Sequence, residues 1–531
     1  MQITTIGHAG LHIQTAHGAI LCDPWFNPAY FCSWYPFPAN DGLDMAALGR
    51  SEYLYVSHLH LDHHDPEWLA RWMDKDTTVL LPDYGVSDLR DALASIGFHR
   101  FLQTRDAEPF EHDGLTLMIA AMTAPNDGPL GDSCLAVDDG TAAVLNQNDG
   151  RPTDLEPLVQ FGAYDAHFLQ YSGAIWYPMV YDLADHVKVG LGQRKRVNGM
   201  DRARRFAEAI GSRWVVPNSG PPAFLDDDLF EINDFGQPGN VFPDQLVFLD
   251  YLKSMGVDNG VFMSTGSTIE VDRTADLPVV RHAGSPDPEA AAEAARHPFE
   301  HKREYLTEYA RRTRDDRERR KAEWSRGQEP LLPVIKQWWE PLMELMPTLC
   351  GRLGDRILLS TGREDILVDF VDQVVVPFDG QDYRYRITAD DALIRTCVER
   401  RLADWVNELF LSCRFRASRT GPYNEHVYTW FKSLSETHAR YVEDWLSSDR
   451  ESKEMWRFGD HLVQRHCPHL GADLARFGNV EEGVLTCGLH GWQFDLETGA
   501  CLTSDDAHLQ TKHIDHRDAE DIRAASVPGP G

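Results

Sequence analysis

The 531-residue chain lacks a long hydrophobic run, a secretory signal and a dense set of cysteines. No stretch reaches the roughly 18 apolar residues that a membrane-spanning helix needs. The first residues, Met1 to His8, have neither the basic nor the apolar segment of a signal peptide. Nine cysteines in this length do not predict a disulfide framework. We therefore expect a cytoplasmic protein that does not enter a membrane.

Basic residues are scarce compared with acidic ones. The chain has 51 lysines and arginines against 83 aspartates and glutamates, which gives a formal net charge of -32. Such a surface would repel a phosphate backbone, so nucleic-acid binding is excluded as a main function. The length and a hydrophobic content of 42% predict a globular chain with more than one core.

Two of the cysteines are paired with histidines near the end of the chain. Cys467 lies two residues before His469, and Cys487 lies three residues before His490. Two thiolates for one iron and two imidazoles for the other are the ligand set of a Rieske 2Fe-2S centre. A zinc site built from the same four residues is the alternative. High-potential Rieske proteins carry an extra cysteine in each loop, but Ala472 and Leu489 stand at those places here, so the segment resembles the ferredoxin-like or oxygenase kind.

A second cluster of metal-binding residue types follows an apolar strand predicted over residues 54–57. The sequence there is His58-Leu59-His60-Leu61-Asp62-His63, and Asp65-Pro66 predicts the start of a helix directly after it. Alternate residues of an extended segment share a side, so these side chains can converge on a metal. A solvated, histidine-rich loop is the simpler alternative.

This pattern resembles the metallo-β-lactamase fold, a four-layer αββα sandwich. Besides the histidine motif, the resemblance rests on Gly7-His8-Ala9-Gly10, Asp23-Pro24 and Asn148-Asp149-Gly150. The resemblance implies a metal pair: His58 and His60 would bind one metal, Asp62 and His63 the other, and Asp149 would bridge them.

The chain departs from that family at two positions where a further histidine is usual. Residues 123–128 and 216–220 contain no histidine. Asn126, Asp127 or Asp132 would substitute for the first, and His167 or His186 would come from elsewhere. We leave an altered or incomplete site open. His167 alternates with apolar neighbours, which favours a place in the core.

The metal-binding lobe has one dense basic stretch. Arg194, Arg196 and Arg202 lie close together in the sequence, and guanidinium groups suit bidentate binding of phosphate or carboxylate. They are candidate substrate contacts. A helix face exposed to solvent is the alternative.

The pattern of elements predicts an α/β chain with three domains. We expect a metallo-β-lactamase-like domain over 1–280, an α+β connector over 281–450, a small all-β Rieske domain over 451–516, and a tail over 517–531. Residues 287–324 predict one long charged helix, and residues 390–410 a further helix. The order of helices and strands in the connector weakly resembles the sterol-carrier-protein fold.

The two metal motifs together indicate a reaction. Metallo-β-lactamase-fold proteins are mostly zinc hydrolases, but zinc has no accessible redox change and would leave a Rieske centre without a task. We therefore expect mononuclear or dinuclear non-haem iron, and a monooxygenase that activates dioxygen. The combination resembles the CMP-N-acetylneuraminate hydroxylase family, which implies a nucleotide-sugar substrate and electrons from a small haem cytochrome. The domain order differs from the one we expect in that family, so a specialised metabolite fits equally.

Partners and alternatives follow from the same motifs. We expect an external reductase, ferredoxin or small haem cytochrome and a small-molecule substrate, and a homo-oligomer is compatible with the sequence. One alternative is a zinc hydrolase whose cluster senses redox state. Another is an electron-transfer protein with a degenerate metal lobe.

Overall fold

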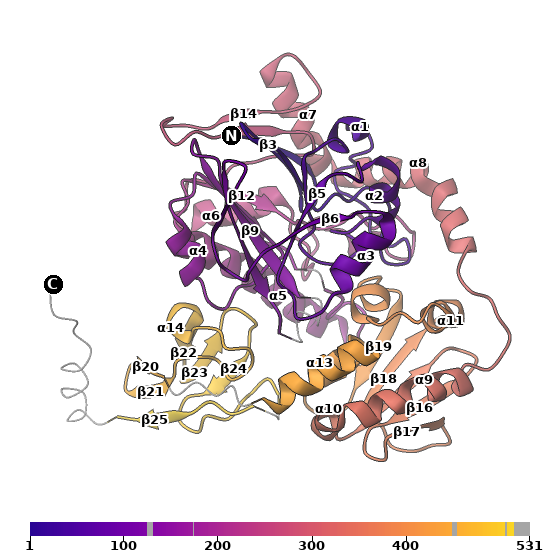
Figure 1. The fold of residues 1–531 in the computed structure, drawn as a ribbon. Helices are drawn as coiled ribbons and strands as arrows, with labels where there is room; N and C mark the ends of the chain where they lie inside the picture. Colours follow the sequence, from indigo (N-terminus) through magenta and orange to yellow (C-terminus); the bar gives the residue numbers. More distant parts are fainter. Residues whose placement is uncertain (125–130, 174, 449–453, 505–506, 515–531) are drawn as a thin grey trace. The chain divides into compact units, whose positions relative to one another are not determined.

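The computed structural model describes residues 1–124, 131–173, 175–448, 454–504 and 507–514 (Figure 1). The chain forms two compact units. The first comprises Met1–Thr420 and Tyr428–Leu446, and the second comprises Gly421–Val427 together with the described residues from Ser447 onward. Asn126 and Asp127, two of the proposed substitute ligands, lie outside the described residues, as does the expected tail.

The first sheet of unit 1 combines an antiparallel and a parallel part. Strands β1, β2 and β3 pair antiparallel, and β3, β4, β5 and β6 pair parallel. The sheet order is β14-β13-β1-β2-β3-β4-β5-β6, with β1 (Gln2–Gly7), β2 (Gly10–Thr15), β3 (Gly18–Cys22), β4 (Tyr53–Tyr55), β5 (Thr78–Leu81), β6 (Arg100–Gln103), β13 (Thr268–Glu270) and β14 (Val279–Arg281).

The second sheet has the order β12-β11-β10-β9-β8-β7. Its strands are β7 (Phe110–His112), β8 (Leu115–Met122), β9 (Asp132–Asp138), β10 (Ala143–Asn148), β11 (Ala166–Gln170) and β12 (Trp214–Asn218). Ile3 and Ile13 of the first sheet belong to one buried cluster with Leu117, Leu135 and Val144 of the second. The two sheets therefore face each other across a shared apolar core.

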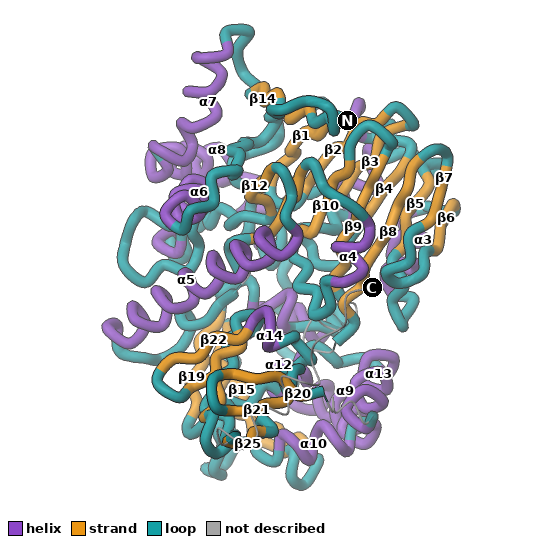
Figure 2. Tube along the Cα trace, turned by 90° about the vertical axis from the view of Figure 1, so that its left-hand side faces the viewer, coloured by secondary structure: helices purple, strands orange, loops and turns teal. Residues whose placement is uncertain are grey.

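Helices cover the outer faces of this pair of sheets. Helix α2 (Pro66–Trp72) and α3 (Asp88–Ile96) bury Trp68 and Leu93 against strand residues of the first sheet. Helix α5 (Asp185–Ile210) contacts β11, and α6 (Gln245–Ser254) contacts β12 of the second sheet. Figures 1 and 2 show the resulting layers. The expected αββα sandwich is confirmed. Short helices α1 (Met45–Leu48) and α4 (Glu156–Phe161) and the 3-10 turn Phe230–Ile232 complete this region.

The charged segment after the sandwich forms two helices. Helix α7 (Pro288–Glu300) ends at His301, whose backbone leaves helical geometry with φ -115° and ψ 37°, and α8 (Lys302–Ala322) starts there. Our expectation of a single helix was therefore wrong. Leu306 and Tyr309 of α8 pack with Tyr35 and Phe37 of the sandwich, so α8 is held against the first lobe.

The rest of unit 1 is an α+β region built around a second sheet-and-helix core. Its sheet has the order β17-β16-β15-β18-β19, and its aromatic core includes Trp339, Trp405 and Phe431. The helix expected over 390–410 ends at Glu399 and is followed by a single π-helical turn, Val406–Phe410. The elements are α9 (Leu332–Leu345), α10 (Pro347–Leu353), β15 (Arg356–Ser360), β16 (Asp365–Asp369), β17 (Val374–Pro377), β18 (Tyr385–Ala389), α11 (Asp391–Glu399), β19 (Phe415–Arg419), α12 (His426–Phe431) and α13 (Glu436–Ser447).

The described residues of unit 2 form mainly two small antiparallel sheets and one short helix. One has the order β20-β21-β25 and the other the order β22-β23-β24. The elements are β20 (Met455–Phe458), β21 (His461–Gln464), α14 (Leu474–Phe477), β22 (Gly478–Glu481), β23 (Val484–Cys487), β24 (Gln493–Asp495) and β25 (Thr511–His513). Across the described parts of both units, no helix combines the length and apolar character needed to cross a bilayer.

Candidate metal centres

The histidine motif lies in the loop between β4 and α2. Asp65 caps α2 by accepting a hydrogen bond from the Trp68 backbone N–H at 2.9 Å, and it also accepts from the N–H groups of Phe26 and Asn27. Pro66 occupies the first turn of the helix. These bonds hold the carboxyl end of the loop, and the motif folds back into the protein, where His58, Asp62 and His63 are buried.

The first candidate ligand group consists of His58, His60 and Asp132. The Nε2 atom of His58 lies 2.7 Å from Nδ1 of His60 and 3.3 Å from Oδ1 of Asp132. Asp132 starts β9, which runs antiparallel to β10, so it lies beside the carboxyl end of β10. Among the suggested substitute ligands that lie in the described residues, Asp132 is the one that the structure brings to the site.

The second group consists of His8, Asp62 and His63. His8 Nε2 lies 2.9 Å from Oδ2 of Asp62, and His63 Nε2 lies 3.9 Å from the same oxygen. His8 occupies the tight turn between β1 and β2 in a left-handed conformation, with φ 49°. Its side chain is only 4% exposed. The sequence reasoning used His8 as part of a fold motif and missed it as a candidate ligand.

Asp149 lies between the two groups. One of its carboxylate oxygens is 3.5 Å from His63 Nε2, and it forms a third ligand set with His58 and His63, one histidine from each group. The turn at Asn148 positions Asp149. Asn148 has a left-handed backbone conformation, and its side chain donates to the Ser133 carbonyl at 2.8 Å and accepts from the Asp149 N–H. This location fits the bridging role that the family resemblance implies.

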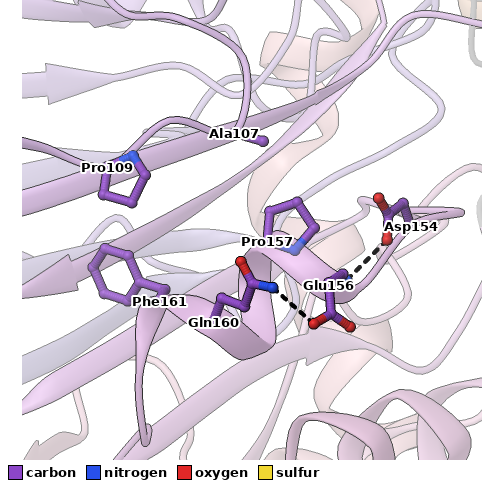
Figure 3. Close-up of a pocket in the computed structure, with 7 residues that line it drawn as sticks. All are labelled: Ala107, Pro109, Asp154, Glu156, Pro157, Gln160 and Phe161. Atoms are coloured by element: carbon purple, nitrogen blue, oxygen red, sulfur yellow. Dashed lines mark hydrogen bonds between the residues drawn. The ribbon is translucent and has the colours of Figure 1, made fainter. Parts of the chain in front are cut away.

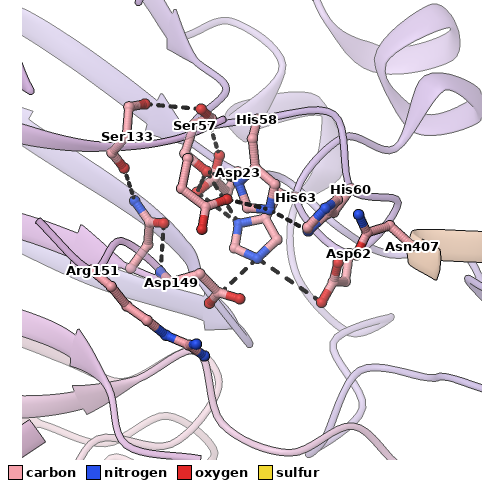
Figure 4. Close-up of polar contacts among 12 residues, drawn as sticks. Asp23, Ser57, His58, His60, Asp62, His63, Ser133, Asp149, Arg151 and Asn407 are labelled. Carbon is pink, nitrogen blue, oxygen red and sulfur yellow. Dashed lines mark hydrogen bonds and ion pairs between the residues drawn. The ribbon is translucent and has the colours of Figure 1, made fainter. Parts of the chain in front are cut away.

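The other ring nitrogens of two histidines are held by neighbouring polar groups (Figure 4). Asp23 Oδ2 lies 3.1 Å from Nδ1 of His63, and the Ser57 hydroxyl lies 2.9 Å from Nδ1 of His58. Tyr30 donates a short hydrogen bond to Asp62. Such contacts orient imidazole and carboxylate ligands, so that Nε2 of His58 and of His63 points into the site.

Several buried atoms at the same place form no hydrogen bond with any described residue. They include His8 Nε2, His63 Nε2, Asp132 Oδ1 and Asp149 Oδ1. Leaving such groups without a partner is costly, and a metal ion would satisfy them together. Burial and the neighbouring His58 lower the pKa of His60 to about 3, which keeps it neutral as a metal ligand must be. Burial opposes ionisation of Asp62, but His63 and His8 hold its pKa below its ordinary value. The residues present therefore fit a pair of metal ions.

The remaining sequence candidates lie elsewhere. His167 is buried in β11 with Nε2 2.8 Å from Gln147 Oε1, and His186 is exposed on α5. Arg194 is exposed on the same helix, while Arg196 pairs with Asp234 at 2.5 Å. Arg202 is half-buried on α5, and burial together with the charge of Arg151 lowers the pKa of its guanidinium group.

A surface hollow beside α4 is separate from these ligands. It has a volume of about 340 Å³ and contains no histidine (Figure 3). Its polar side chains are engaged locally, since Gln160 donates to Glu156 at 2.8 Å. It is lined by Ala107, Pro109, Asp154, Glu156, Pro157, Gln160 and Phe161.

In unit 2 the two predicted Rieske loops have the same pattern of backbone hydrogen bonds. Cys467 N–H donates to the Ala472 carbonyl at 2.9 Å, and Cys487 N–H donates to the Trp492 carbonyl at 2.7 Å. In each loop a left-handed glycine, Gly471 or Gly491, donates back to the cysteine carbonyl. Glycine suits these turns because it tolerates positive φ without strain.

The loops bring the four predicted ligands together. Both cysteines are buried and form no disulfide, and the rings of His469 and His490 lie 4.9 Å apart between centroids. A hydrogen bond from the Cys467 thiol, with further bonds from the backbone N–H groups of His490 and Leu489, lowers the pKa of Cys487 to about 7 although burial opposes this. Two thiols and two imidazoles in this arrangement fit a Rieske 2Fe-2S cluster.

Glu425 and Trp492 contact one of the histidines. His469 Nε2 lies 2.6 Å from the Glu425 carboxylate, and its ring stacks on Trp492 with centroids 4.1 Å apart. The sequence reasoning did not identify Glu425, which lies outside the Rieske motif. A carboxylate at this place orients the imidazole and adds negative charge next to the cluster site.

Comparison with known proteins shows the family of the chain through a relative that matches nearly its whole length. A model described as an Rv3818-like, SCP2-like domain matches residues 331–448, and the Rieske [2Fe-2S] domain model matches residues 454–512. The chain is 46% identical over 512 residues to the Rieske 2Fe-2S iron-sulfur protein Rv3818 of Mycobacterium tuberculosis, across 95% of this chain and 98% of that protein. The chain belongs to the Rv3818-like family. The Rieske [2Fe-2S] domain of this Rv3818-like protein contains Cys467, His469, Cys487 and His490.

Similar solved structures cover about half of the Rv3818-like chain. An isothiocyanate hydrolase from Delia radicum gut bacteria is 13% identical with a TM-score of 0.37, across 51% of this chain and 100% of that chain. The diiron β-hydroxylase CmlA from Streptomyces venezuelae is 16% identical with a TM-score of 0.34, across 50% of this chain and 53% of that chain.

We predict that His8 and Asp132 each hold one metal. His8→Ala and Asp132→Ala should each bind about one metal ion fewer per chain, because each removes one of three donors from a different group. Elemental analysis checks this, with the cluster iron counted separately by electron paramagnetic resonance. His186→Ala, on the exposed face of α5, is the matched control. Full metal content in His8→Ala would exclude His8 as a ligand.

We also predict that Glu425 lowers the reduction potential of the cluster. Glu425→Gln should raise the midpoint potential by about tens of millivolts, because a nearby negative charge disfavours the reduced state. A redox titration followed by electron paramagnetic resonance measures the shift. The exposed Glu481 provides the control, since Glu481→Gln removes the same charge from the same domain. An equal shift in both variants would show that the contact with His469 is unimportant.

Proposed function

We propose that this Rv3818-like protein is a Rieske-fed, non-haem iron monooxygenase that oxygenates a small anionic substrate. The observation that carries the proposal is the donor set of the metal site. Each group contains two histidines and one aspartate: His58, His60 and Asp132 in one, and His8, His63 and Asp62 in the other. Two histidines and a carboxylate are the ligands typical of non-haem ferrous oxygenases.

The Rieske domain supports iron over zinc at this site. Zinc has no accessible redox change, so a zinc pair would leave the electron carrier of the same chain without a role. When bound, a reduced Rieske cluster supplies electrons and a ferrous site activates dioxygen. The protein residues orient the ligands, since Asp23, Ser57 and Tyr30 each contact one of them.

Partners and substrate follow from this proposal. The electrons would come from an external reductase, a ferredoxin or a small haem cytochrome, as Rieske-type oxygenases need such a donor. A nucleotide sugar, suggested by the resemblance to CMP-N-acetylneuraminate hydroxylases, and a specialised metabolite are both candidate substrates.

The two alternative functions, an electron-transfer protein with a degenerate metal lobe and a hydrolase with a redox-sensing cluster, predict different properties of the metal site. The degenerate-lobe alternative rested on the two missing histidines, and the presence of Asp132 and His8 among the converging side chains weakens that reason. A hydrolase with a redox-sensing cluster would contain zinc and would turn over without dioxygen.

We predict that oxygen uptake depends on the Rieske cluster. Reduced, purified protein should contain iron beyond the cluster and should consume dioxygen, while Cys467→Ser should lose the cluster signal and at least about 100-fold of the uptake rate. An oxygen electrode and elemental analysis measure these outcomes. Cys501→Ser in the same domain is the control.

Two results would contradict the proposal. One is a site that contains zinc and no iron in protein purified from iron-replete cells. The other is oxygen uptake that persists in Cys467→Ser at the rate of the unsubstituted protein.

A further inference from the structure

Ser133 is a fully buried serine next to the candidate ligand Asp132. Side chains alternate along a strand, so Ser133 shares a face of β9 with Leu135 and Val137. Both of these residues belong to the apolar core between the two sheets. A hydroxyl therefore occupies the core-facing position of β9 that is nearest to the metal site. Burying a hydroxyl costs free energy unless it is hydrogen-bonded, so its partners indicate its role.

The Ser133 hydroxyl bonds to two groups of the first sheet. It donates to the Ser57 carbonyl at 2.8 Å, a bond drawn in Figure 4, and its oxygen lies 2.7 Å from the Tyr55 hydroxyl. A serine hydroxyl has one proton and a carbonyl only accepts, so Tyr55 must donate to Ser133. Tyr84 donates a short hydrogen bond to the same Ser57 carbonyl, but Tyr84 follows β5 of the first sheet. Of these two donors, Ser133 is the one that comes from the second sheet.

The backbone of Ser133 makes a further contact at the same edge. Its carbonyl accepts from the Asn148 side chain at 2.8 Å, and the oxygen of that side chain accepts from the Asp149 N–H. The three residues that these bonds join are each the chain neighbour of a candidate ligand. They are Ser57 beside His58, Ser133 beside Asp132, and Asn148 beside Asp149.

The two ligand groups depend differently on how the sheets are held together. In the first group, His58 and His60 follow β4 of the first sheet, whereas Asp132 starts β9 of the second. The second group follows β1 and β4, both in the first sheet. Metal ligands bind within a narrow range of distances, so the first group needs two strand ends at a fixed separation. Apolar packing is non-directional, whereas a hydrogen bond fixes a distance and an angle.

We propose that Ser133 is a positioning residue that holds Asp132 at a fixed separation from His58 and thereby sets the metal affinity of the first group. It acts through the backbone of Ser57, which precedes His58, and it touches no ligand side chain itself. The inference rests on the proposed function only for the metal pair that both require. Because the second group takes its ligands from one sheet, the loss of Ser133 should affect the two groups unequally.

Zinc titration of the full-length protein tests the proposal, with affinities measured by competition against a chromophoric chelator after the site metals are removed. His8→Ala leaves the first group intact, and Asp132→Ala leaves the second. Adding Ser133→Ala should weaken zinc binding about tenfold or more in the His8→Ala protein and less than about threefold in the Asp132→Ala protein. Ser51→Ala is the matched control and should change neither affinity. It removes a buried hydroxyl that donates to the Leu48 carbonyl at 2.8 Å, before the opposite end of β4.

A second variant covers a failure to fold, which circular dichroism detects. Ser133→Ala leaves the Tyr55 hydroxyl buried without its Ser133 partner. If this prevents folding, the double variant Tyr55→Phe/Ser133→Ala takes its place, because replacing both partners of a bond by apolar groups is close to neutral. Tyr55→Phe alone keeps the bond from Ser133 to Ser57 and is then the reference, and the double variant should bind zinc at the first group about tenfold more weakly.

Three results would overturn the inference. They are an unchanged affinity of the first group in folded Ser133→Ala, an equal loss of affinity in both groups, which would indicate general destabilisation, and the absence of zinc binding at the site. The titration needs neither iron nor dioxygen. Selective weakening in a protein that consumes no dioxygen would refute the proposed function and leave the role of Ser133 standing. Oxygen uptake together with an unchanged affinity in Ser133→Ala would do the reverse.

Discussion

The candidate metal site depends on the cost of burying ring nitrogens and carboxylate oxygens that have no hydrogen-bond partner among the residues that the structure describes. A protein interior satisfies such groups in nearly all cases, and each exception needs a cause. Here the exceptions include His8 Nε2, His63 Nε2, Asp132 Oδ1 and Asp149 Oδ1, and they converge. Contacts from Asp23 and Ser57 turn two of the rings inward. The surrounding residues thus orient these nitrogen and oxygen atoms so that bound cations would satisfy them.

The α+β region of unit 1 supports one wall of the metal site. The loop that contains Tyr30 has three consecutive left-handed residues, Tyr30, Phe31 and Cys32. Such backbone is unfavourable for residues with side chains unless its surroundings hold it. Tyr30 bonds to Asp62, Trp34 donates to the Leu411 carbonyl at 2.8 Å, and Arg414 donates to the Phe31 carbonyl at 3.2 Å. The region that matches the SCP2-like model therefore helps to position a candidate metal ligand.

The motifs with short, fixed spacing were predictable from the sequence. The loop from His58 to His63 and the two Rieske loops lie where their spacing indicated, because neighbouring residues on one loop share their surroundings whatever the rest of the fold does. The αββα sandwich followed from the resemblance carried by these motifs. Asp132 was one of several candidates, since sequence distance alone does not reveal that the start of β9 lies beside the end of β10.

The roles of His8 and Glu425 could not be predicted from the spacing of residues in the sequence. His8 becomes a candidate only with the strand order, because β1, β3 and β4 run in one direction and their carboxyl ends lie on one edge, where His8, Asp23 and His58 follow. Glu425 precedes the Rieske motif and meets His469 only in the folded unit. The prediction of a single helix over 287–324 was wrong for a local reason. The spacing of apolar and charged residues did not reveal that the helix breaks at His301.

The candidate ligands come from both sheets of the sandwich. His8, Asp62 and His63 follow strands of the first sheet, whereas Asp132 and Asp149 belong to the ends of strands in the second. Metal ions held by this set would act as cross-links between the two layers, and a ligand that binds only the folded state stabilises it. Iron supply would then govern how long the folded chain survives proteolysis, and not only how fast it works.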